Sequence, residues 1–348
     1  MSFDPDAASL PDSGIFGLPR DPKRAEVHVI PVPFDATTSY RKGTHRGPDA
    51  VLRASRQVDL FDALTGRPYE RGIVLLDADE RIAKLNEEGS VKAERIIEVA
   101  GVIGGDAALA RTLGRVNVIG AELNRIVHAQ TNAALDEGRL PAILGGDHST
   151  PFGAIQACAQ RFPGMGVLHF DAHADLRDAF EGFEWSHASI MFNVATKIPE
   201  VAKLVQVGIR DFGEREHAFI HESRGRVRTL FDADWQRAKF DVANLRELVK
   251  KRLDDLPAKV FVSFDVDGLD PTLCPNTGTP VPGGLSWSEA MLWLEELSRS
   301  GREVVGLDLN EVSPGSTAGE EDSWDAIVGA RLLYRLIGVA LMTRKPRR

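Results

Sequence analysis

Short apolar runs alternate with longer amphipathic segments along the chain. Runs rich in Val, Ile, Leu and Phe predict eight strands at residues 27–32, 73–77, 140–145, 166–171, 204–210, 227–231, 260–265 and 304–309. Most of these runs are apolar at successive positions, which is typical of parallel strands covered by helices on both faces. The pattern therefore predicts an α/β fold built on one mostly parallel, eight-stranded sheet.

The segments between these runs carry the periodicity of covering helices. They predict helices at residues 48–56, 93–114, 123–137, 151–161, 242–256, 286–300 and 323–342. Ser286 and Glu289 match a capping box at the start of one of them. Neither an internal repeat nor a Pro/Gly/Ser-rich linker divides the chain. We therefore expect an N-terminal extension over residues 1–25, followed by a single domain over residues 26–348.

Composition and charge narrow the classes of function. The 348 residues include 42 Lys and Arg against 51 Asp and Glu, so the net charge of −9 argues against a nucleic-acid-binding surface. Cys158 and Cys274 form no CxxC motif and no disulfide framework. The N-terminus lacks the pattern of a secretory signal, and the apolar segment 332–342 is too short to span a bilayer. These features predict a cytoplasmic protein without a membrane segment.

Acidic residues and histidines follow four of the predicted strands. The segments are Gly145-Gly146-Asp147-His148, Asp171-Ala172-His173-Ala174-Asp175, Asp265-Val266-Asp267 and Asp308-Leu309-Asn310-Glu311. In an open parallel sheet, ligands bind beyond the carboxyl ends of the strands. Alternation along an extended chain lets the Asp-x-His-x-Asp side chains project together, as it does for the Asp-x-Asp pair. Converging carboxylates repel one another and lose hydration, so a cation is expected between them.

Metal ions are the best candidates for that cation. No basic residue lies inside the Asp-x-His-x-Asp or Asp-x-Asp segments. Imidazole together with carboxylate suits Mn²⁺, Zn²⁺, Ni²⁺ or Fe²⁺ better than Ca²⁺ or Mg²⁺. The candidate ligands are too many for one tetrahedral site: His148, Asp171, His173, Asp175, Asp265 and Asp267. Two divalent ions about 3.5 to 4 Å apart, sharing carboxylates, would use all of them.

A pair of divalent ions predicts hydrolysis, because it lowers the pKa of a bridging water towards neutrality. The sequence has no GxSxG elbow and no phosphate-binding loop, which leaves serine chemistry and nucleotide binding without support. His187 lies close enough to Asp175 in sequence to shuttle a proton. Glu311 is the candidate for binding a cationic substrate, and we predict that His187, Glu311 and the ligand Asp175 form the catalytic group.

Three of these motifs resemble those of the ureohydrolases, the family of arginase, agmatinase, guanidinobutyrase and formimidoylglutamase. They are Gly-Gly-Asp-His-Ser at 145–149, Asp-Ala-His-Ala-Asp at 171–175 and Ser-Phe-Asp-Val-Asp-Gly-Leu-Asp-Pro at 263–271. The resemblance covers about residues 27–342. It implies a three-layer α/β/α, arginase-like fold with two Mn²⁺ or Ni²⁺ ions, in a homo-oligomer that is a trimer or a hexamer.

The resemblance also implies roles for individual residues. It assigns His148, Asp171 and Asp175 to one metal, while Asp171, His173, Asp265 and Asp267 hold the other metal or bridge the two. It makes His187 the proton shuttle and Glu311 the partner of the substrate guanidinium. The implied reaction attacks the guanidinium carbon and releases urea with an amine.

Two features of the sequence bear on the substrate: the segment after His187 and the position of Arg177. Typical agmatinases continue His-Gly-x-Pro-Phe after the shuttle histidine, whereas this chain has His-Ala-Ser-Ile-Met at 187–191. The chain looks more like the agmatinase-like branch that includes guanidine hydrolases. Arg177, two positions after Asp175, would disfavour a dicationic substrate such as agmatine, and formimidoylglutamase also carries Arg there. The alternative is that Arg177 pairs with Asp178 or Glu181 at the rim.

The predicted substrate pocket is small. Trp185, with Phe183 and Phe180, is the candidate for its wall, although aromatic residues at this density are more often part of a core. The prediction is hydrolysis of guanidine or a small substituted guanidine to urea and ammonia or an amine. Agmatinase, guanidinobutyrase and formimidoylglutamase activities are alternatives. Alternatives from other classes are a non-catalytic metal-binding subunit paired with a paralogue and a deacetylase-like amide hydrolase with a single zinc.

Overall fold

The computed structural model describes residues 4–315 and 323–344. Its sheet has eight strands in the order β2-β1-β3-β8-β7-β4-β5-β6, and every neighbouring pair is parallel. The strands are β1 (Val27–Val32), β2 (Ile73–Leu75), β3 (Leu140–Gly145), β4 (Gly166–Phe170), β5 (Lys203–Ile209), β6 (Val227–Phe231), β7 (Lys259–Asp265) and β8 (Glu303–Asn310). All the predicted strands are thereby confirmed, as is the α/β class.

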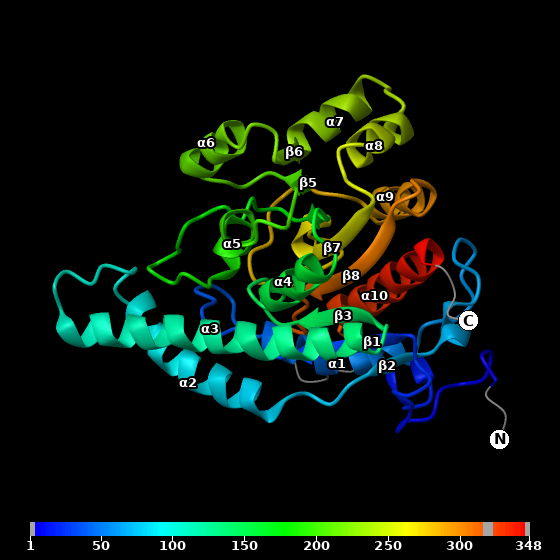
Figure 1. Ribbon diagram of the computed structural model, residues 1–348, viewed down its shortest axis with the longest axis horizontal. Coiled ribbons are helices and arrows are strands. Elements are labelled where there is room, and N and C mark those ends of the chain that lie inside the picture. The colour runs from blue at the N-terminus through cyan, green and yellow to red at the C-terminus, as the bar shows by residue number, and fades with distance from the viewer. Residues whose placement is uncertain (1–3, 316–322, 345–348) are drawn as a thin grey trace.

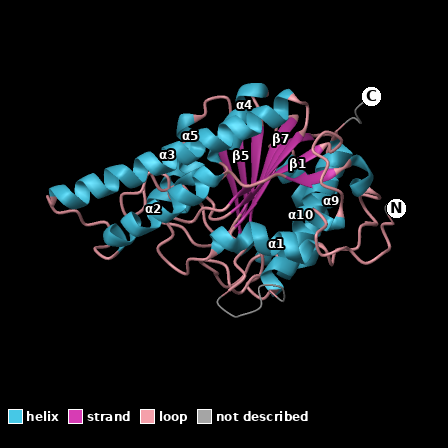
Figure 2. Cartoon of the chain, turned by 90° about the horizontal axis from the view of Figure 1, so that it is seen from below, coloured by secondary structure: helices cyan, strands magenta, loops and turns pink. Residues whose placement is uncertain are grey.

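Helices cover both faces of this sheet and complete the three layers. Those of the described residues are α1 (Gly47–Ser55), α2 (Glu80–Ile97), α3 (Ala107–Asp136), α4 (Phe152–Arg161), α5 (Ile190–Lys197), α6 (Glu214–Glu222), α7 (Asp232–Phe240), α8 (Leu245–Leu253), α9 (Trp287–Arg299) and α10 (Trp324–Thr343). Figure 2 shows the sheet between α3, α4 and α5 on one side and α1, α9 and α10 on the other.

Two large apolar clusters form the core, one on each face of the sheet. In β3, Leu140, Ala142 and Leu144 belong to the cluster under α1, α9 and α10. Ile143, between them, belongs to the cluster under α3, α4 and α5. Because both faces of the strand are buried, successive positions are apolar, which explains the absence of polar alternation in the sequence.

The helix predictions around α2 and α3 were wrong. The expected helix at 93–114 is broken between Ile97 and Ala107, because Gly101, Gly104 and Gly105 adopt positive φ angles. Asp106 then caps a new helix by accepting hydrogen bonds from two backbone N–H groups. That helix, α3, runs on without a break through the stretch predicted as a separate helix at 123–137. The other predicted helices are confirmed within three residues at each end. Helices α5, α6 and α7 and residues 80–92 of α2 were not predicted.

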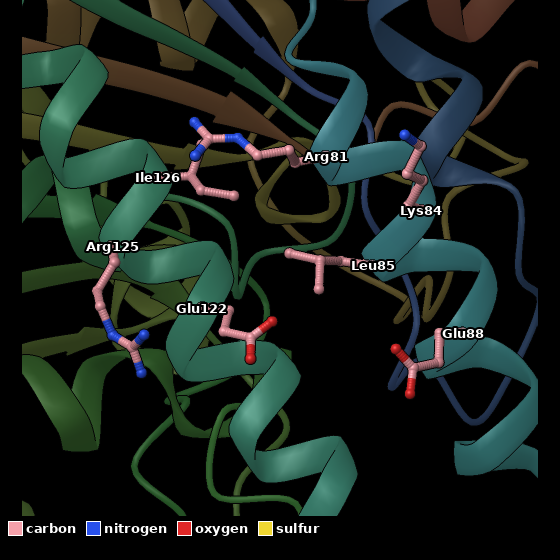
Figure 3. A pocket seen from close by; sticks show the side chains of 7 residues that line it. All are labelled: Arg81, Lys84, Leu85, Glu88, Glu122, Arg125 and Ile126. Atoms are coloured by element: carbon pink, nitrogen blue, oxygen red, sulfur yellow. The ribbon is translucent and has the colours of Figure 1, made fainter.

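The α2–α3 pair projects from one end of the molecule (Figures 1 and 2). A hollow of about 390 Å³ lies between the two helices (Figure 3), lined by Arg81, Lys84, Leu85, Glu88, Glu122, Arg125 and Ile126. Arg115 of α3 bridges the pair by binding both Glu88 and Glu122. This charged hollow contains none of the residues predicted for catalysis.

Part of the predicted N-terminal extension is packed on the core. Ile15 and Phe16, in a short 3-10 helix, are both 1% exposed. The Phe16 backbone N–H donates to the Ser55 hydroxyl at 2.8 Å, and its ring meets Tyr334 edge-on. The segment therefore covers the junction of α1 and α10.

Helix α10 is apolar because it is a core helix. By length and composition alone it passes the test for a membrane span, but 72% of its most apolar window is buried inside the protein. It packs against β8 and α1. Burial against the sheet accounts for its composition.

Two glycines of α3 provide a matched test of packing. A Cβ on exposed Gly114 would meet nothing within 4 Å, whereas a Cβ on buried Gly120 would lie 2.6 Å from the Cβ of Trp185. We expect Gly114→Ala to stabilise the protein by about 0.5 to 1 kcal/mol through helix propensity. Gly120→Ala should destabilise it by about 1 to 3 kcal/mol through overpacking. Urea unfolding checks both, and equal effects of the two variants would contradict the packing described for Trp185.

Candidate metal centre and active site

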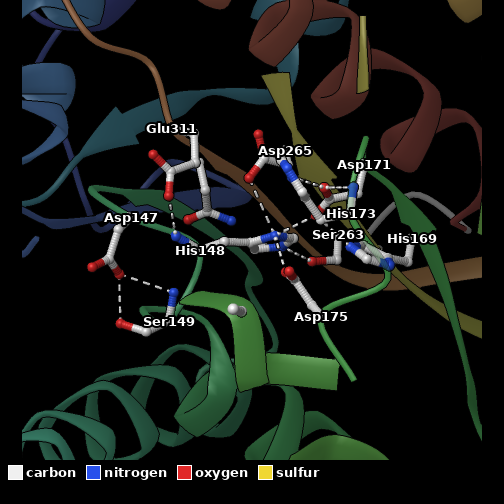
Figure 4. Close-up of polar contacts among 12 residues, drawn as sticks. Asp147, His148, Ser149, His169, Asp171, His173, Asp175, Ser263, Asp265 and Glu311 are labelled. Carbon is white, nitrogen blue, oxygen red and sulfur yellow. Dashed lines mark hydrogen bonds and ion pairs between the residues drawn. The ribbon is translucent and has the colours of Figure 1, made fainter. Parts of the chain in front are cut away.

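The sheet order brings the candidate site residues together. His148 follows β3, Glu311 follows β8, Asp265 ends β7 and Asp171 follows β4. These strands are four consecutive neighbours, β3-β8-β7-β4, in the middle of the sheet. Because all are parallel, their carboxyl ends lie along one edge, where the side chains converge (Figure 4).

His148 lies at the centre of the cluster. Its Nδ1 is 2.9 Å from Asp171 Oδ2 and 3.3 Å from both Asp175 Oδ2 and Asp265 Oδ2. The imidazole and these three carboxylates are at most 4% exposed. One ring nitrogen facing three carboxylate oxygens is the arrangement expected of groups that share a cation.

A second group of ligand atoms adjoins the first. His173 Nδ1 lies 3.0 Å from Asp267 Oδ2 and 3.4 Å from Asp171 Oδ1. Two sets of atoms close enough to hold an ion can be drawn, one of His148, His169, Asp171 and Asp175, the other of Asp171, His173 and Asp267. Asp171 belongs to both sets and offers a different oxygen to each group. This donor set fits two divalent ions bridged by a carboxylate.

The pKa shifts in the metal-free cluster show that its buried carboxylates repel one another. Bound cations would relieve this repulsion. Burial and the neighbouring Asp171 raise the pKa of Asp175 to about 8. Burial, with Asp267 and Asp171 nearby, raises the pKa of Asp265 well above its usual value. Burial disfavours the charged form of His148, but hydrogen bonds to Asp171, Asp175 and Asp265 raise its pKa well above the usual value. In the metal-free protein, bound protons thus supply the positive charge that balances the carboxylates.

Asp175 is held in a strained backbone conformation. Its φ is +53°, in the left-handed region that a non-glycine residue rarely adopts. The Asp175 carbonyl accepts a hydrogen bond from the Phe192 backbone N–H of α5, which fixes this turn. This backbone conformation directs the Asp175 carboxylate towards His148.

His169 holds Asp171 in place by a hydrogen bond. Gln206 donates from Nε2 to His169 Nδ1 at 3.1 Å, so the proton of His169 sits on Nε2 and is donated to Asp171 Oδ2 at 2.8 Å. Thr229 donates to Gln206 Oε1 and thereby fixes the orientation of the amide. We infer that His169 orients Asp171 rather than binding an ion itself. Gln206 was missed by the sequence analysis, because nothing in a strand marks one buried glutamine as functional.

A second chain of hydrogen bonds orients His148. Its Nε2 lies 2.9 Å from Ser263 Oγ, which donates to Asp308 Oδ1 at 3.1 Å. Asp308 also accepts from the Phe264 backbone N–H and the Asn310 side chain. When His148 gives up its Nδ1 proton to bind a metal ion, Ser263 holds the remaining proton on Nε2, and Nδ1 offers its lone pair. Ser263 and Asp308 lie in the sequence motifs, but only the paired strands β7 and β8 reveal their connection.

His187 lies beside the cluster with a lowered pKa. It begins a short 3-10 helix that Ser186 caps by accepting from the Ala188 backbone N–H. Burial, with a further contribution from the charge of His173, lowers the pKa of His187 to about 4. Its Nδ1 is buried and has no hydrogen-bond partner among the described residues. The imidazole is therefore free to accept a proton.

Glu311 presents one free carboxylate oxygen. Its φ is +64°, and its Oε1 accepts a hydrogen bond from the His148 backbone N–H at 3.0 Å (Figure 4). Its Oε2 is buried without a partner among the described residues. Burial, with Asp265 and Asp147 nearby, raises the pKa of Glu311 well above its usual value. A Cβ on Gly278 would lie 3.2 Å from Oε2, so glycine there leaves room next to this oxygen.

Arg177 lies near His187 but is paired differently from the sequence alternative. Its Nε is 3.6 Å from Glu216 Oε2, rather than next to Asp178 or Glu181, and its guanidinium lies 5.2 Å from the Phe180 ring centroid. The charge of Arg177 contributes to the lowered pKa of His187. Glu216 is itself fixed, since it accepts hydrogen bonds from the backbone N–H groups of Leu176 and Gly213.

The remaining aromatic candidates, Trp185 and Phe183, pack against residues of neighbouring helices. Trp185 meets the Phe152 ring edge-on at 4.9 Å and lies against Gly120 of α3. Phe183 is fully buried in a small cluster with residues of α2 and α3. These contacts show both residues packing the segment that precedes His187. A role of Trp185 in binding substrate stays a prediction.

Comparison with known proteins identifies the family. The model of the Arginase family matches residues 25–338. An N(1)-aminopropylagmatine ureohydrolase of Thermus thermophilus is 33% identical over 93% of this chain and 94% of its own length. The chain belongs to the Arginase family. A guanidinobutyrase of Pseudomonas aeruginosa is 30% identical over 89% of this chain and 85% of its own length.

The fold comparison agrees with this family. The solved structure of an agmatine ureohydrolase of Thermoplasma volcanium superposes with a TM-score of 0.69, covering 98% of this chain and 96% of that one at 21% identity. Membership of the Arginase family confirms the predicted resemblance and makes the chain a metal-dependent ureohydrolase acting on amidines.

Metal binding to this Arginase-family centre should release protons. A carboxylate must be ionised to bind a metal, and Asp175, with its pKa of about 8, holds a proton at pH 7 in the metal-free protein. We expect Mn²⁺ binding to release protons at pH 7, and the Asp175 contribution to fall to about a tenth of a proton by pH 9. Calorimetry in two buffers of different ionisation enthalpy measures the number of protons released per metal ion bound. Metal-saturated protein is the control. No release of protons at pH 7 would contradict the raised pKa of Asp175.

Proposed function

We propose that this protein hydrolyses a small guanidino compound to urea and ammonia or an amine, at a centre of two divalent ions. The free Glu311 Oε2 carries the proposal, because it is a buried, unpaired carboxylate oxygen beside the cluster. A guanidinium offers donors in a planar fork that matches a carboxylate. Binding such a cation would satisfy the one oxygen of Glu311 that the protein leaves unpaired.

The cluster supports two metal sites that share Asp171. His148, Asp171 and Asp175 would hold one ion, and Asp171, His173, Asp265 and Asp267 would hold the other or bridge the two. Divalent ions in such a site lower the pKa of a water molecule and so supply the nucleophile for hydrolysis. We propose Mn²⁺ or Ni²⁺, because imidazole and carboxylate together suit either ion.

The side chains around the cluster would position the substrate and move its protons. Glu311 would bind the guanidinium from one side and fix its plane next to the cluster. His187, which is neutral because of its lowered pKa, would accept a proton at Nδ1 and return it to the departing nitrogen. Phe180, whose ring centroid is 6.5 Å from that of His187, would help to exclude water from this transfer.

Arg177 favours substrates whose tail is neutral or anionic. Glu216 and the Phe180 ring hold its guanidinium, and the charge acts on His187. The two relatives carry names of substrates with opposite tails, a polyamine in one and a carboxylate in the other. A fixed cation repels an amine tail, so we propose guanidine, a small alkylguanidine or 4-guanidinobutyrate ahead of agmatine.

The assembly and location of the enzyme are proposals of the same kind. We propose a cytoplasmic homo-oligomer, a trimer or hexamer, with a hetero-oligomer formed with a paralogue as the alternative. The intact catalytic set supports an active subunit over a purely structural one, since His187 and Glu311 both have free atoms beside the cluster.

A urea-release panel tests the substrate. Protein loaded with Mn²⁺ or with Ni²⁺ is assayed on guanidine, methylguanidine, 4-guanidinobutyrate, agmatine and arginine. We expect kcat/KM for one of the first three to exceed that for agmatine, because of the charge of Arg177. Agmatine as the best substrate would refute the proposed preference. Inactivity on every compound at full metal loading would favour the non-catalytic subunit.

The variant Arg177→Gln tests the charge directly. Removing the cation should raise kcat/KM for agmatine relative to 4-guanidinobutyrate by about tenfold, the scale of one partly exposed charge contact. Arg161→Gln is the matched control, because it removes a charge from a surface pair with Asp136 at the far ends of α4 and α3. An unchanged ratio in Arg177→Gln would show that Arg177 does not act on the substrate tail.

A further inference from the structure

Helix α6 carries two exposed histidines one turn apart, outside the acidic cluster. His217 and His221 are four positions apart, so they lie on the same face of the helix. Their Nε2 atoms are 3.1 Å apart and their ring centroids 4.4 Å apart. Both rings therefore direct the same nitrogen to one point at the surface.

The separation of these nitrogens suits chelation. In a tetrahedral site, bonds of about 2.0 to 2.1 Å from a divalent ion to two imidazoles place the nitrogens about 3.3 to 3.4 Å apart. The separation in the protein is 3.1 Å, so small rotations of the rings would admit an ion. In the metal-free protein the two nitrogens share a hydrogen bond, which metal binding would replace.

One of the two rings is already held in place. The His217 ring is stacked on Phe212 with centroids 5.9 Å apart and planes 16° apart. It also lies 6.0 Å from the Phe231 ring. Because the ring is fixed by these contacts and by the helix backbone, less conformational entropy is lost when an ion binds.

We propose that His217 and His221 form a surface site for a divalent transition metal of the Zn²⁺, Ni²⁺ or Cu²⁺ class. Imidazole ligands favour these ions over Mn²⁺, which prefers oxygen. Water would complete the coordination, since the described residues supply two nitrogens at this point. The site does not depend on the proposed function.

Occupation of this site would stabilise α6. An ion bound across one turn stabilises the folded helix by mass action. Glu216, next to His217, accepts a hydrogen bond from the Leu176 backbone N–H and lies by Arg177. The ion would therefore strengthen the helix that holds the charged rim of the active site.

Nickel binding to the full chain tests the site. The acidic centre is first filled with Mn²⁺, and Ni²⁺ is then titrated while the bound Mn²⁺ and Ni²⁺ are counted. Wild type should bind one Ni²⁺ more than H217Q or H221Q. Each single variant should lose about 100-fold in affinity, because the second imidazole of a chelate acts at high effective concentration. For the same reason, the further loss in the double variant should be much smaller than 100-fold, because only the weak binding of a single imidazole remains to be removed.

H128Q is the matched control, since His128 contacts Gln160 and Asn132 rather than a second histidine. It should bind as much Ni²⁺ as wild type. Equal binding by wild type, H217Q and H221Q would overturn the site, and small additive losses would show two separate histidines instead of a chelate. Urea release with Mn²⁺ should be unchanged in these variants, so this test and that of the proposed function fail independently.

Discussion

The mutual repulsion of buried carboxylates is the constraint on which the site depends. Asp171, Asp175, Asp265 and Asp267 meet at the carboxyl edge of the sheet, away from water. Alone, such a group would favour protonation or separation of its members, and the raised pKa values of Asp175 and Asp265 show this tendency. The fold keeps the group together because the four central parallel strands end at the same place.

Two chains of hydrogen bonds hold the ligand side chains in place against that repulsion. One chain of hydrogen bonds runs from Gln206 through His169 to Asp171, and another runs from Asp308 through Ser263 to His148. Both chains begin in strands, whose positions the core fixes. They set the tautomer of each imidazole and leave the cluster-facing lone pairs and carboxylate oxygens available to a cation.

The substrate side of the centre is built from loops instead of strands. Glu311 lies just beyond β8 and His187 in a short 3-10 helix, and each has one atom that the described residues leave unpaired. Arg177 is held from the side by Glu216, in the first turn of α6. The candidate metal ligands thus rest on the sheet, while the charge that we propose selects the substrate rests on a contact between a loop and α6.

The sequence by itself determined the strands, the α/β class, the family and the candidate ligands. Buried parallel strands leave continuous apolar runs, and carboxylates beside such runs are too costly to occur without a function. It missed the turn between α2 and α3, where Gly101, Gly104 and Gly105 adopt positive φ angles. It also broke α3 wrongly, although Gly120 is tolerated inside that helix, where it makes room for Trp185 from a distant segment. The partner of Arg177 and the supporting roles of Gln206 and Asp308 were decided by tertiary structure alone. Each of these contacts joins side chains from different strands or helices, and local sequence patterns carry no information about which distant elements become neighbours.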